Sequence, residues 1–285
     1  MAFSLNVRGH LLVVDRPMVM GILNLTPDSF YEQSRIPDTE TALRKVHLMM
    51  QDGMDILDIG AVSSRPGAEL PDAAEERRRL QDTLTAITAH FPRLVVSVDT
   101  FRAEIARMAA DCGAHIINDI SGGAYDAEMF ATVGRLQMPY VLMHLRETPA
   151  TMQDKPRYQD VVTDLILYFS QKMQQAHEAG IHDIIIDPGF GFAKTLRHNY
   201  RLLAHLRDFE MLHAPVLAGM SRKSMLYKLL YCTPQEALNA TTAANMIALQ
   251  NGAAILRVHD VKEAAQCVRI FCQCRQDGEE NPDRP

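Results

Sequence analysis

The sequence predicts a single-domain α/β protein, a (β/α)8 barrel of the TIM type, and three observations predict it. Short apolar runs alternate eight times with longer segments of helical spacing, without a break in composition. Several of the longer segments stop at a glycine directly before the next run, as helices do at their C-terminal caps. The chain has 285 residues, and a barrel of this type occupies about 250.

The eight expected strands are short and apolar, and most contain β-branched residues. They cover Met18–Asn24, Ile56–Gly60, Leu94–Asp99, His115–Ile120, Tyr140–His144, Asp183–Asp187, Pro215–Gly219 and Ala254–His259. The helices that follow them are expected over Thr39–Gly53, Ala73–His90, Arg102–Gly113, Ala127–Gln137, Tyr158–Gly180, Leu196–Arg207, Pro234–Gly252 and Lys262–Cys274. An open doubly wound sheet is the alternative, but it usually has a glycine-rich phosphate loop after its first strand, and this sequence has no such motif.

We expect the barrel and an N-terminal hairpin to occupy residues 1–274 as one domain. Residues 5–14 have Arg8-Gly9 at their centre and predict the hairpin, which would cover one mouth of the barrel. The tail, residues 275–285, is rich in Asp, Glu and Pro and contains no apolar residue. We therefore expect the tail to be disordered.

Composition and charge exclude several classes of protein. The hydrophobic content of 47% excludes a disordered chain, and the net charge of −6 with a pI near 6.0 argues against a nucleic-acid partner. No run approaches the roughly 18 apolar residues of a membrane span, and the N-terminus lacks the pattern of a signal peptide. The five cysteines are odd in number and unrelated in spacing, so they predict reduced thiols in the cytoplasm rather than disulfides or a zinc site.

Polar residues stand at the ends of the expected strands, where a barrel of this type builds its active site. They are Asn24, Asp58, Asp99, Asn118, His144, Asp187, Arg257 and His259. Arg257 and His259 share one face of the last strand, because side chains alternate along a strand with a period of two.

Several of these side chains also have a purely structural interpretation. Asp99 could cap the helix that follows it, and Asp187 could bond to the backbone of its own Asp-Pro-Gly turn. Asn118 could satisfy loop amides, and His144 could be a buried histidine of the core. Lys223 and Arg65 could be solvated surface cations.

The residue types at this mouth suit a particular kind of ligand. A carboxylate can accept two parallel N–H bonds from a flat, nitrogen-rich ring, and Asp99 and Asp187, with the amide of Asn118, could do so here. The four cations Arg65, Lys223, Arg257 and His259 would attract an anion. The sequence therefore predicts a phosphorylated aromatic heterocycle as the ligand.

Seven segments resemble the sequence motifs of dihydropteroate synthases, in the same order and at similar spacing. They are Met20–Phe30, Asp58–Gly60 continuing through Ser63–Ala68, Ser97–Thr100, Ile117–Ile120, Asp187–Phe192, Gly219–Ser224 and Arg257–Val261. The resemblance extends from about Val14 to Phe271, which is nearly the whole chain.

The resemblance implies an enzyme that joins 4-aminobenzoate to 6-hydroxymethyl-7,8-dihydropterin diphosphate in an SN1-like displacement, giving 7,8-dihydropteroate and pyrophosphate in folate biosynthesis. It implies a pterin pocket of Asp99, Asn118, Asp187 and Lys223, and a pyrophosphate site of Asn24, Ser64, Arg65, Arg257 and His259. It also implies Mg²⁺ held at Asn24, and an aminobenzoate site that includes Phe192, Lys223 and Ser224. The catalytic residues would be Asp99, Lys223, Arg257 and Arg65. Such enzymes are usually homodimers, and aminobenzoate mimics such as sulfonamides are expected to inhibit them.

The chain departs from the family pattern in two loops. Tyr31-Glu32-Gln33-Ser34 stands where the family commonly has Ser-Asp-Gly-Gly, and Ala61-Val62-Ser63-Ser64 replaces Gly-Glu-Ser-Thr. Three alternatives are considered beside the synthase. They are a pterin-dependent methyltransferase, a Schiff-base aldolase that uses Lys223, and a pterin-binding paralogue without catalysis.

Overall fold

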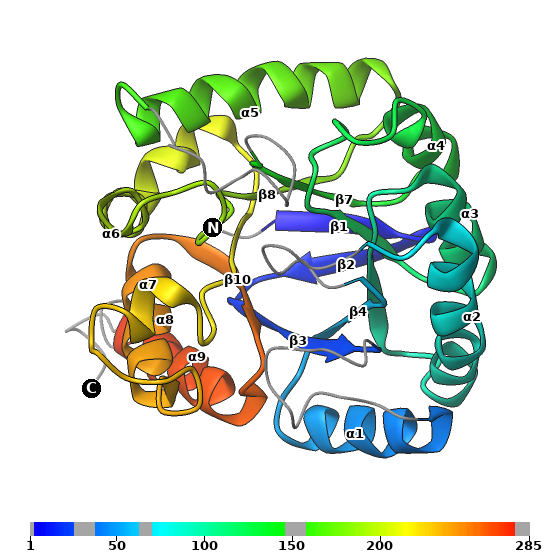
Figure 1. The fold of residues 1–285 in the computed structure, drawn as a ribbon, viewed down its shortest axis with the longest axis horizontal. Helices are drawn as coiled ribbons and strands as arrows, with labels where there is room; N and C mark the ends of the chain where they lie inside the picture. The colour runs from blue at the N-terminus through cyan, green and yellow to red at the C-terminus, as the bar shows by residue number, and fades with distance from the viewer. Residues whose placement is uncertain (1–2, 26–37, 63–69, 146–157, 277–285) are drawn as a thin grey trace, which may run out of the picture.

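The computed structural model describes residues 3–25, 38–62, 70–145 and 158–276, and eight parallel strands within these ranges close into a barrel. Around the barrel the strands follow the order β10-β3-β4-β5-β6-β7-β8-β9, and helices surround them (Figure 1). The strands are β3 (Met18–Asn24), β4 (Ile56–Gly60), β5 (Val95–Asp99), β6 (Ile116–Asp119), β7 (Tyr140–Met143), β8 (Ile184–Asp187), β9 (Val216–Ala218) and β10 (Ala253–Val258). The predicted TIM-type α/β barrel is confirmed.

Each strand is followed by at least one helix. The eight longer helices are α1 (Thr39–Gln51), α2 (Ala73–His90), α3 (Ala103–Asp111), α4 (Met129–Leu136), α5 (Val161–Glu178), α6 (Leu196–Ala204), α8 (Leu238–Gln250) and α9 (Val261–Gln276). A 3-10 helix over Leu206–Leu212 and the four-residue helix α7 (Ser224–Tyr227) were not predicted. In the described ranges, no helix is both long and apolar enough to cross a membrane.

Side chains that alternate along the strands divide the apolar core into two parts. Every second residue packs outward against the helices in the larger cluster, as Leu57, Val96 and Ile117 do. The residues between them fill the inside of the barrel near the N-terminal ends of the strands, in a layer made of Met20, Ile56, Ile116, Val141, Ile185, Leu217 and Ile255. The barrel is therefore a filled core with no channel at this end.

An antiparallel hairpin of β1 (Phe3–Val7) and β2 (His10–Val14) packs against this inner layer. Leu5, Val7 and Val14 of the hairpin belong to the same apolar cluster as the barrel interior. Helix α9 extends to Gln276, beyond the expected end at Cys274, and residues 277–285 of the expected tail lie outside the described residues.

Polar residues replace apolar ones one step further along the same inward faces. Asp58 follows Ile56 by two positions, and Asn118 follows Ile116 in the same way. On β8, Asp187 follows Ile185 by two positions, and on β10, Arg257 follows Ile255 by two positions. The barrel interior therefore changes from apolar to polar toward the C-terminal ends of the strands, where the site was expected.

Candidate active site

The polar layer centres on the guanidinium of Arg257, which reaches from β10 to carboxylates on two other strands. Its Nε donates to Oδ2 of Asp58 at 2.7 Å, and its Nη2 donates to Oδ2 of Asp99 at 2.8 Å. The amide nitrogen of Asn118 donates to the same Asp58 oxygen at 3.1 Å. Four side chains from four strands are thus joined in one network.

Asp58 was singled out as a polar residue at a strand end, but the sequence analysis gave it no role in the site. Its side chain is 0% exposed, and its Oδ1 has no hydrogen-bond partner among the described residues. The sequence could have indicated a role for Asp58, because a carboxylate in the middle of a five-residue buried strand is rare without a partner. Gly60 on the same strand makes room for the neighbouring carboxylate, since a Cβ there would lie 3.1 Å from the Cβ of Asp99.

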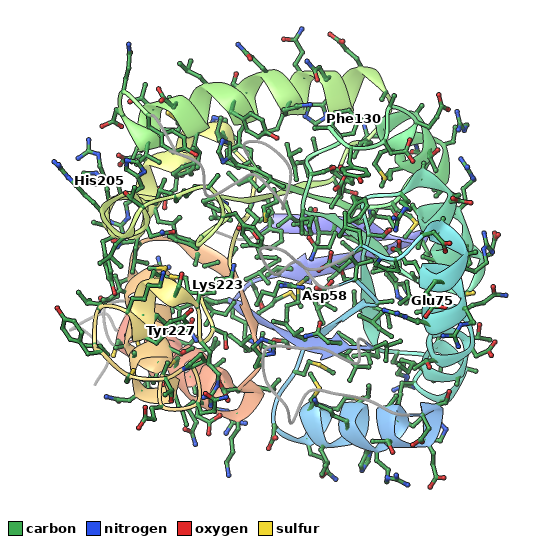
Figure 2. All side chains as sticks on the ribbon, in the orientation of Figure 1. Asp58, Glu75, Phe130, His205, Lys223 and Tyr227 are labelled. Carbon is green, nitrogen blue, oxygen red and sulfur yellow. The ribbon has the colours of Figure 1, made fainter. Side chains whose placement is uncertain are left out.

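Asp187 and Lys223 occupy the other side of the layer, and Figure 2 shows Lys223 and Asp58 inside the ring of helices. Oδ1 of Asp187 accepts from the backbone N–H of Gly189 at 2.7 Å. Nζ of Lys223 donates to the carbonyl of Phe190 at 2.7 Å and lies 4.6 Å from the centre of the Phe192 ring. Lys223 is therefore turned inward, which contradicts the surface interpretation, whereas the turn interpretation of Asp187 is correct.

Asp99 does not cap a helix. The N-cap position of α3 is held by Arg102, and the N–H of Ala103 is instead bound by Asp126 at 2.7 Å. The capping interpretation is wrong because Asp99 points inward along β5 toward Arg257.

Burial shifts the protonation equilibria of the layer toward the neutral forms. It raises the pKa of Asp99 and of Asp187 above the usual range, against the opposing attraction of Arg257 and Lys223 respectively. It lowers the pKa of Lys223 to about 8, although the Asp187 carboxylate acts in the other direction. Arg257 stays charged between its two carboxylates.

His259 was expected to act as a cation, and this expectation is wrong for the free protein. Burial and then the charge of Arg257 lower the pKa of His259 to about 3, so the ring is neutral near pH 7. Its backbone N–H donates to Oγ of Ser221 at 3.2 Å. A neutral imidazole can still bind an anion as an N–H donor.

The remaining predicted residues fall at the same mouth or outside the described ranges. Asn24 ends β3, where it is paired with Gly60 of β4, and Ser224 begins α7 directly after Lys223. Ser64 and Arg65 lie outside the described residues, as does the Tyr31–Ser34 departure. No group of three or more His, Cys, Asp or Glu that could hold a metal is found in the ranges that the structure describes.

An apolar cluster lies beside the polar layer at the same end of the barrel. Its buried members are Phe101, Ile120 and Met143, and Val62, Leu70, Leu145 and Phe192 pack against them half-buried. Val62, one of the departures from the family pattern, therefore packs where an apolar side chain is stabilised. The cluster offers an apolar surface, and its member Phe192 lies next to Lys223.

A second buried lysine, Lys194, was not predicted. Its side chain is 6% exposed, and its Nζ contacts Nδ1 of His144 at 3.1 Å and the carbonyls of Gly189 and Phe192 at 3.0 Å each. Burial lowers its pKa to about 7. His144 is the satisfied core histidine that the sequence favoured, and Lys194 closes the loop between Asp187 and α6 against it.

Comparisons with known proteins agree with this geometry. The family model described as "Pterin binding enzyme" matches residues 20–259. The chain is 42% identical over 273 residues to the dihydropteroate synthase of Escherichia coli K12, covering 94% of this chain and 95% of that protein. It is 40% identical over 258 residues to the dihydropteroate synthase of Synechocystis, covering 90% of this chain and 89% of the relative.

Solved structures give the same result. The Yersinia pestis dihydropteroate synthase, in a sulfonamide drug complex, matches with a TM-score of 0.92 at 39% identity over 96% of this chain and 100% of that one. The Xanthomonas albilineans enzyme in complex with 7,8-dihydropteroate matches with a TM-score of 0.85 at 35% identity, covering 96% and 99% of the two chains. These matches favour the synthase over the methyltransferase and the aldolase. The chain therefore belongs to the pterin-binding enzyme family and, within it, to the dihydropteroate synthases.

Proposed function

We propose that the polar layer binds the pterin ring of 6-hydroxymethyl-7,8-dihydropterin diphosphate and that the chain joins it to 4-aminobenzoate there. The observation that supports this most is the set of buried carboxylates around Arg257. The side chain of Asp99 is 17% exposed, and the carboxylate of Asp187 is attracted by the charge of Lys223. A ring edge that presents parallel N–H groups would satisfy such oxygens at little cost.

The pterin ring would be held by Asp99, Asn118, Asp187 and Lys223, while the fully buried Asp58 would hold Asn118 and Arg257 in place. Asp187 would accept from the amino-pyrimidine edge, and Lys223 would donate to the ring oxygen or nitrogen that faces it. Because Lys223 has a pKa of about 8, most of it carries a proton at neutral pH and can donate. The apolar inner layer below excludes water from this edge.

The diphosphate would lie above the ring, near Arg257 and His259 at the end of β10. The resemblance to the family adds Asn24, Ser64 and Arg65 to this site. Arg257 keeps its charge, and His259 would contribute a neutral N–H until the anion raises its proton affinity. The positive charges stabilise the pyrophosphate as it leaves.

Mg²⁺ fits the donor set at Asn24. Magnesium usually binds through one or two carboxylates together with substrate phosphates and water, and here the amide oxygen of Asn24 would take the place of a carboxylate. When bound, the ion would neutralise charge on the leaving group. Substitution Asn24→Ala should raise the Mg²⁺ concentration that gives half-maximal activity, and an unchanged Mg²⁺ dependence would remove Asn24 from the site.

The aminobenzoate would lie against Phe192, Lys223 and Ser224. The apolar cluster of Phe101, Ile120, Met143, Val62, Leu70, Leu145 and Phe192 offers a surface for its aryl ring, and Lys223 offers a positive charge. Sulfonamides share the aryl amine and would compete for the same surface. The Yersinia pestis relative was solved as a sulfonamide complex.

The chemistry is a displacement at the methylene carbon of the pterin. The bond from this carbon to the diphosphate oxygen breaks, and a bond to the arylamine nitrogen forms, with loss of one proton from the amine. Asp99 and Asp187 would stabilise the positive charge that develops on the pterin, while Arg257 and Arg65 stabilise the departing pyrophosphate. No nucleophilic side chain is needed, because the leaving group is already activated.

The experiment that tests this proposal measures pyrophosphate release with pterin diphosphate and Mg²⁺, with and without 4-aminobenzoate. Release that requires aminobenzoate and forms dihydropteroate would support the proposed chemistry. Tight binding of the pterin without coupled release would instead identify a non-catalytic paralogue and overturn it.

A homodimer in the cytoplasm is also proposed. The five cysteines are odd in number and unrelated in spacing, which supports a reducing compartment. Leu229, Leu230 and Tyr231 form a continuous apolar segment with exposed fractions of 45%, 56% and 96%, which is typical of an interaction surface. Light scattering should give twice the chain mass of 32.0 kDa, and a mass of one chain would contradict the dimer.

A further inference from the structure

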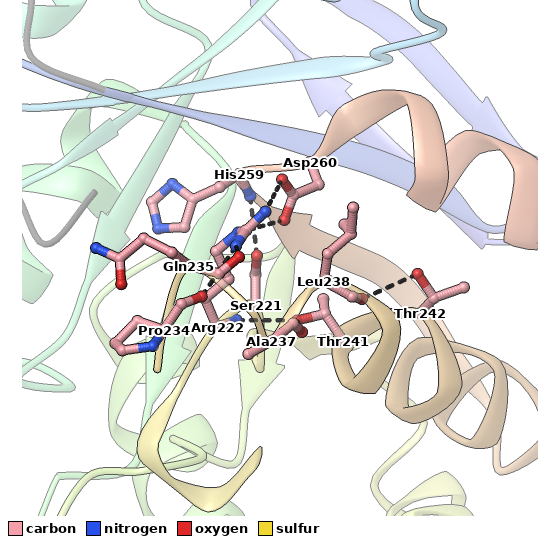
Figure 3. Close-up of polar contacts among 10 residues, drawn as sticks. All are labelled: Ser221, Arg222, Pro234, Gln235, Ala237, Leu238, Thr241, Thr242, His259 and Asp260. Atoms are coloured by element: carbon pink, nitrogen blue, oxygen red, sulfur yellow. Dashed lines mark hydrogen bonds and ion pairs between the residues drawn. The ribbon is translucent and has the colours of Figure 1, made fainter. Parts of the chain in front are cut away.

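Arg222 is a buried arginine that takes no part in the proposed chemistry, and its side chain binds two other segments of the chain at once. Its side chain is 7% exposed. Nε and Nη2 donate to the two carboxylate oxygens of Asp260, each at 2.9 Å. Nη1 donates to the carbonyl of Pro234 at 2.9 Å and to that of Gln235 at 2.6 Å (Figure 3). Few of its N–H groups are therefore available to a substrate.

The backbone around Arg222 is fixed as firmly as its side chain. Arg222 has φ of 53°, in the left-handed region that side chains other than glycine rarely adopt. Its N–H donates to Oγ1 of Thr241 at 3.1 Å, and that hydroxyl donates to the carbonyl of Ala237 at 2.8 Å. A strained conformation of this kind persists only where the surrounding structure imposes it.

The position of the ion pair in the chain suggests what it does. Arg222 directly precedes Lys223 and Ser224, which are proposed to contact the pterin and the aminobenzoate. Asp260 directly follows His259, which is proposed to contact the diphosphate. The pair therefore joins the loop after β9 to the end of β10, and the Ser221–His259 hydrogen bond at 3.2 Å joins them a second time.

We infer that Arg222, through Asp260, is a positioning residue that holds Lys223 and Ser224 at a fixed distance from Arg257 and His259. The inference rests on the proposed roles of those four residues. A displacement requires the reacting atoms to approach to about 3 Å, and a misplacement of 1 Å can cost about 100-fold in rate. A bidentate arginine–carboxylate pair fixes both the distance and the relative orientation of the two side chains, whereas a lysine fixes only the distance.

An arginine–carboxylate pair elsewhere in the barrel provides a control with a more exposed arginine, 50% against 7% for Arg222. Arg16 donates to both oxygens of Asp55, with Nη1 at 3.1 Å and Nη2 at 2.6 Å. It lies just before β3, at the end of the barrel opposite the proposed site. Replacing Arg16 by lysine removes the same geometry without touching the loops that carry Lys223 and His259.

The test compares Arg222→Lys, Asp260→Asn, their double variant and Arg16→Lys. We measure kcat with both substrates saturating, the binding of unphosphorylated pterin, and the urea midpoint of unfolding. Arg222→Lys and Asp260→Asn should each lower kcat about 10- to 100-fold. The double variant should be no slower than the slower single variant, because Asp260→Asn removes an interaction that Arg222→Lys has already broken. Binding of the unphosphorylated pterin should weaken less than kcat falls, because Asp99, Asn118 and Asp187 of the proposed pocket lie on strands that the pair does not hold.

Arg16→Lys should lower only the urea midpoint. If Arg222→Lys and Asp260→Asn behave like Arg16→Lys, with normal kcat, the pair is structural and the inference is wrong. Additive losses in the double variant would also overturn it. If Arg222→Lys does not fold, Asp260→Asn alone carries the same prediction for kcat. Failure of the proposed pterin pocket is distinguishable, because Asp187→Asn would then bind pterin normally whatever happens at Arg222.

Discussion

Nη2 of Arg257 lies 2.8 Å from Oδ2 of Asp99, although 158 positions separate the two residues along the chain. The same nitrogen lies 2.6 Å from Oδ2 of Asp58, whose side chain is fully buried. One cation therefore compensates two carboxylates inside the barrel. This arrangement makes Arg257 important for the fold as well as for an anionic substrate.

Replacing Arg257 by alanine should destabilise the protein by about 3–5 kcal/mol, since it leaves buried carboxylates without their partner. Without the guanidinium, the pKa of Asp99, which burial already raises, rises further. A carboxyl group with a raised folded pKa binds its proton more tightly in the folded state, so its contribution to stability falls as pH rises above about 4. The loss caused by Arg257→Ala should therefore be larger at pH 8 than at pH 5.

Urea unfolding at the two pH values measures this difference. Arg44→Ala is the control, because the Arg44–Glu40 ion pair has side chains that are 61% and 81% exposed and contributes little. An Arg257→Ala loss that does not depend on pH would contradict the assigned role of the network.

Asp99→Asn should lower kcat about 100- to 1000-fold, because it removes the negative charge that stabilises the developing cation on the pterin. Ser97→Ala, two positions earlier on the inward face of the same strand, is the control. Its buried Oγ has no partner among the described residues, so the change should leave kcat unchanged and the urea midpoint equal or higher. Equal rates for Asp99→Asn and the unchanged chain would exclude Asp99 from catalysis.

Asp187→Asn should weaken pterin binding about 100-fold or more, because a neutral amide cannot accept two N–H bonds from the ring edge. The amide oxygen can keep the hydrogen bond from Gly189, so the loop should retain its shape. Asp183→Asn is the control at the other end of the same segment, where the carboxylate accepts from the N–H of Asn6 at 2.9 Å. Calorimetric titration with pterin checks the prediction, and equal affinities for the two variants would contradict it.

Much of the barrel could be predicted because its pattern repeats. The strand Ile56–Gly60 and the helix Ala73–His90 have the predicted bounds residue for residue. The 3-10 helix Leu206–Leu212 and the helix Ser224–Tyr227 were missed, because segments of seven and four residues are too short to show a hydrophobic period.

The site was harder to predict than the fold. Strand period places Asn118, Asp187 and Arg257 on inward faces, but which carboxylate meets Arg257 depends on the register and width of the closed barrel. Lys194 and Arg222 gave no signal, because their burial comes from loops that fold back through left-handed residues such as Gly189, with φ of 69°. The local sequence does not show that a loop folds back over the site.

Lys194 gives the last prediction, a pH dependence of stability. Its pKa is lowered to about 7 by burial, whereas a lysine in the unfolded chain has a pKa of about 10.4. Between these values the unfolded state binds the extra proton, so Lys194 makes the free energy of unfolding rise with pH, by up to about 1.4 kcal/mol per pH unit. Lys223, with a pKa of about 8, acts in the same direction.

Lys194→Met should therefore flatten the rise in the free energy of unfolding between about pH 7 and pH 9, measured with urea. The variant should also weaken the binding of aminobenzoate, because the carbonyls of Gly189 and Phe192 lose their donor and the loop that carries Phe192 loosens. Lys228→Met, at an exposed position beyond α7, should leave the slope unchanged. If the free energy of unfolding rises with pH equally in Lys194→Met and in the unchanged chain, Lys194 keeps an ordinary pKa. Its three contacts would then be made by the charged ammonium.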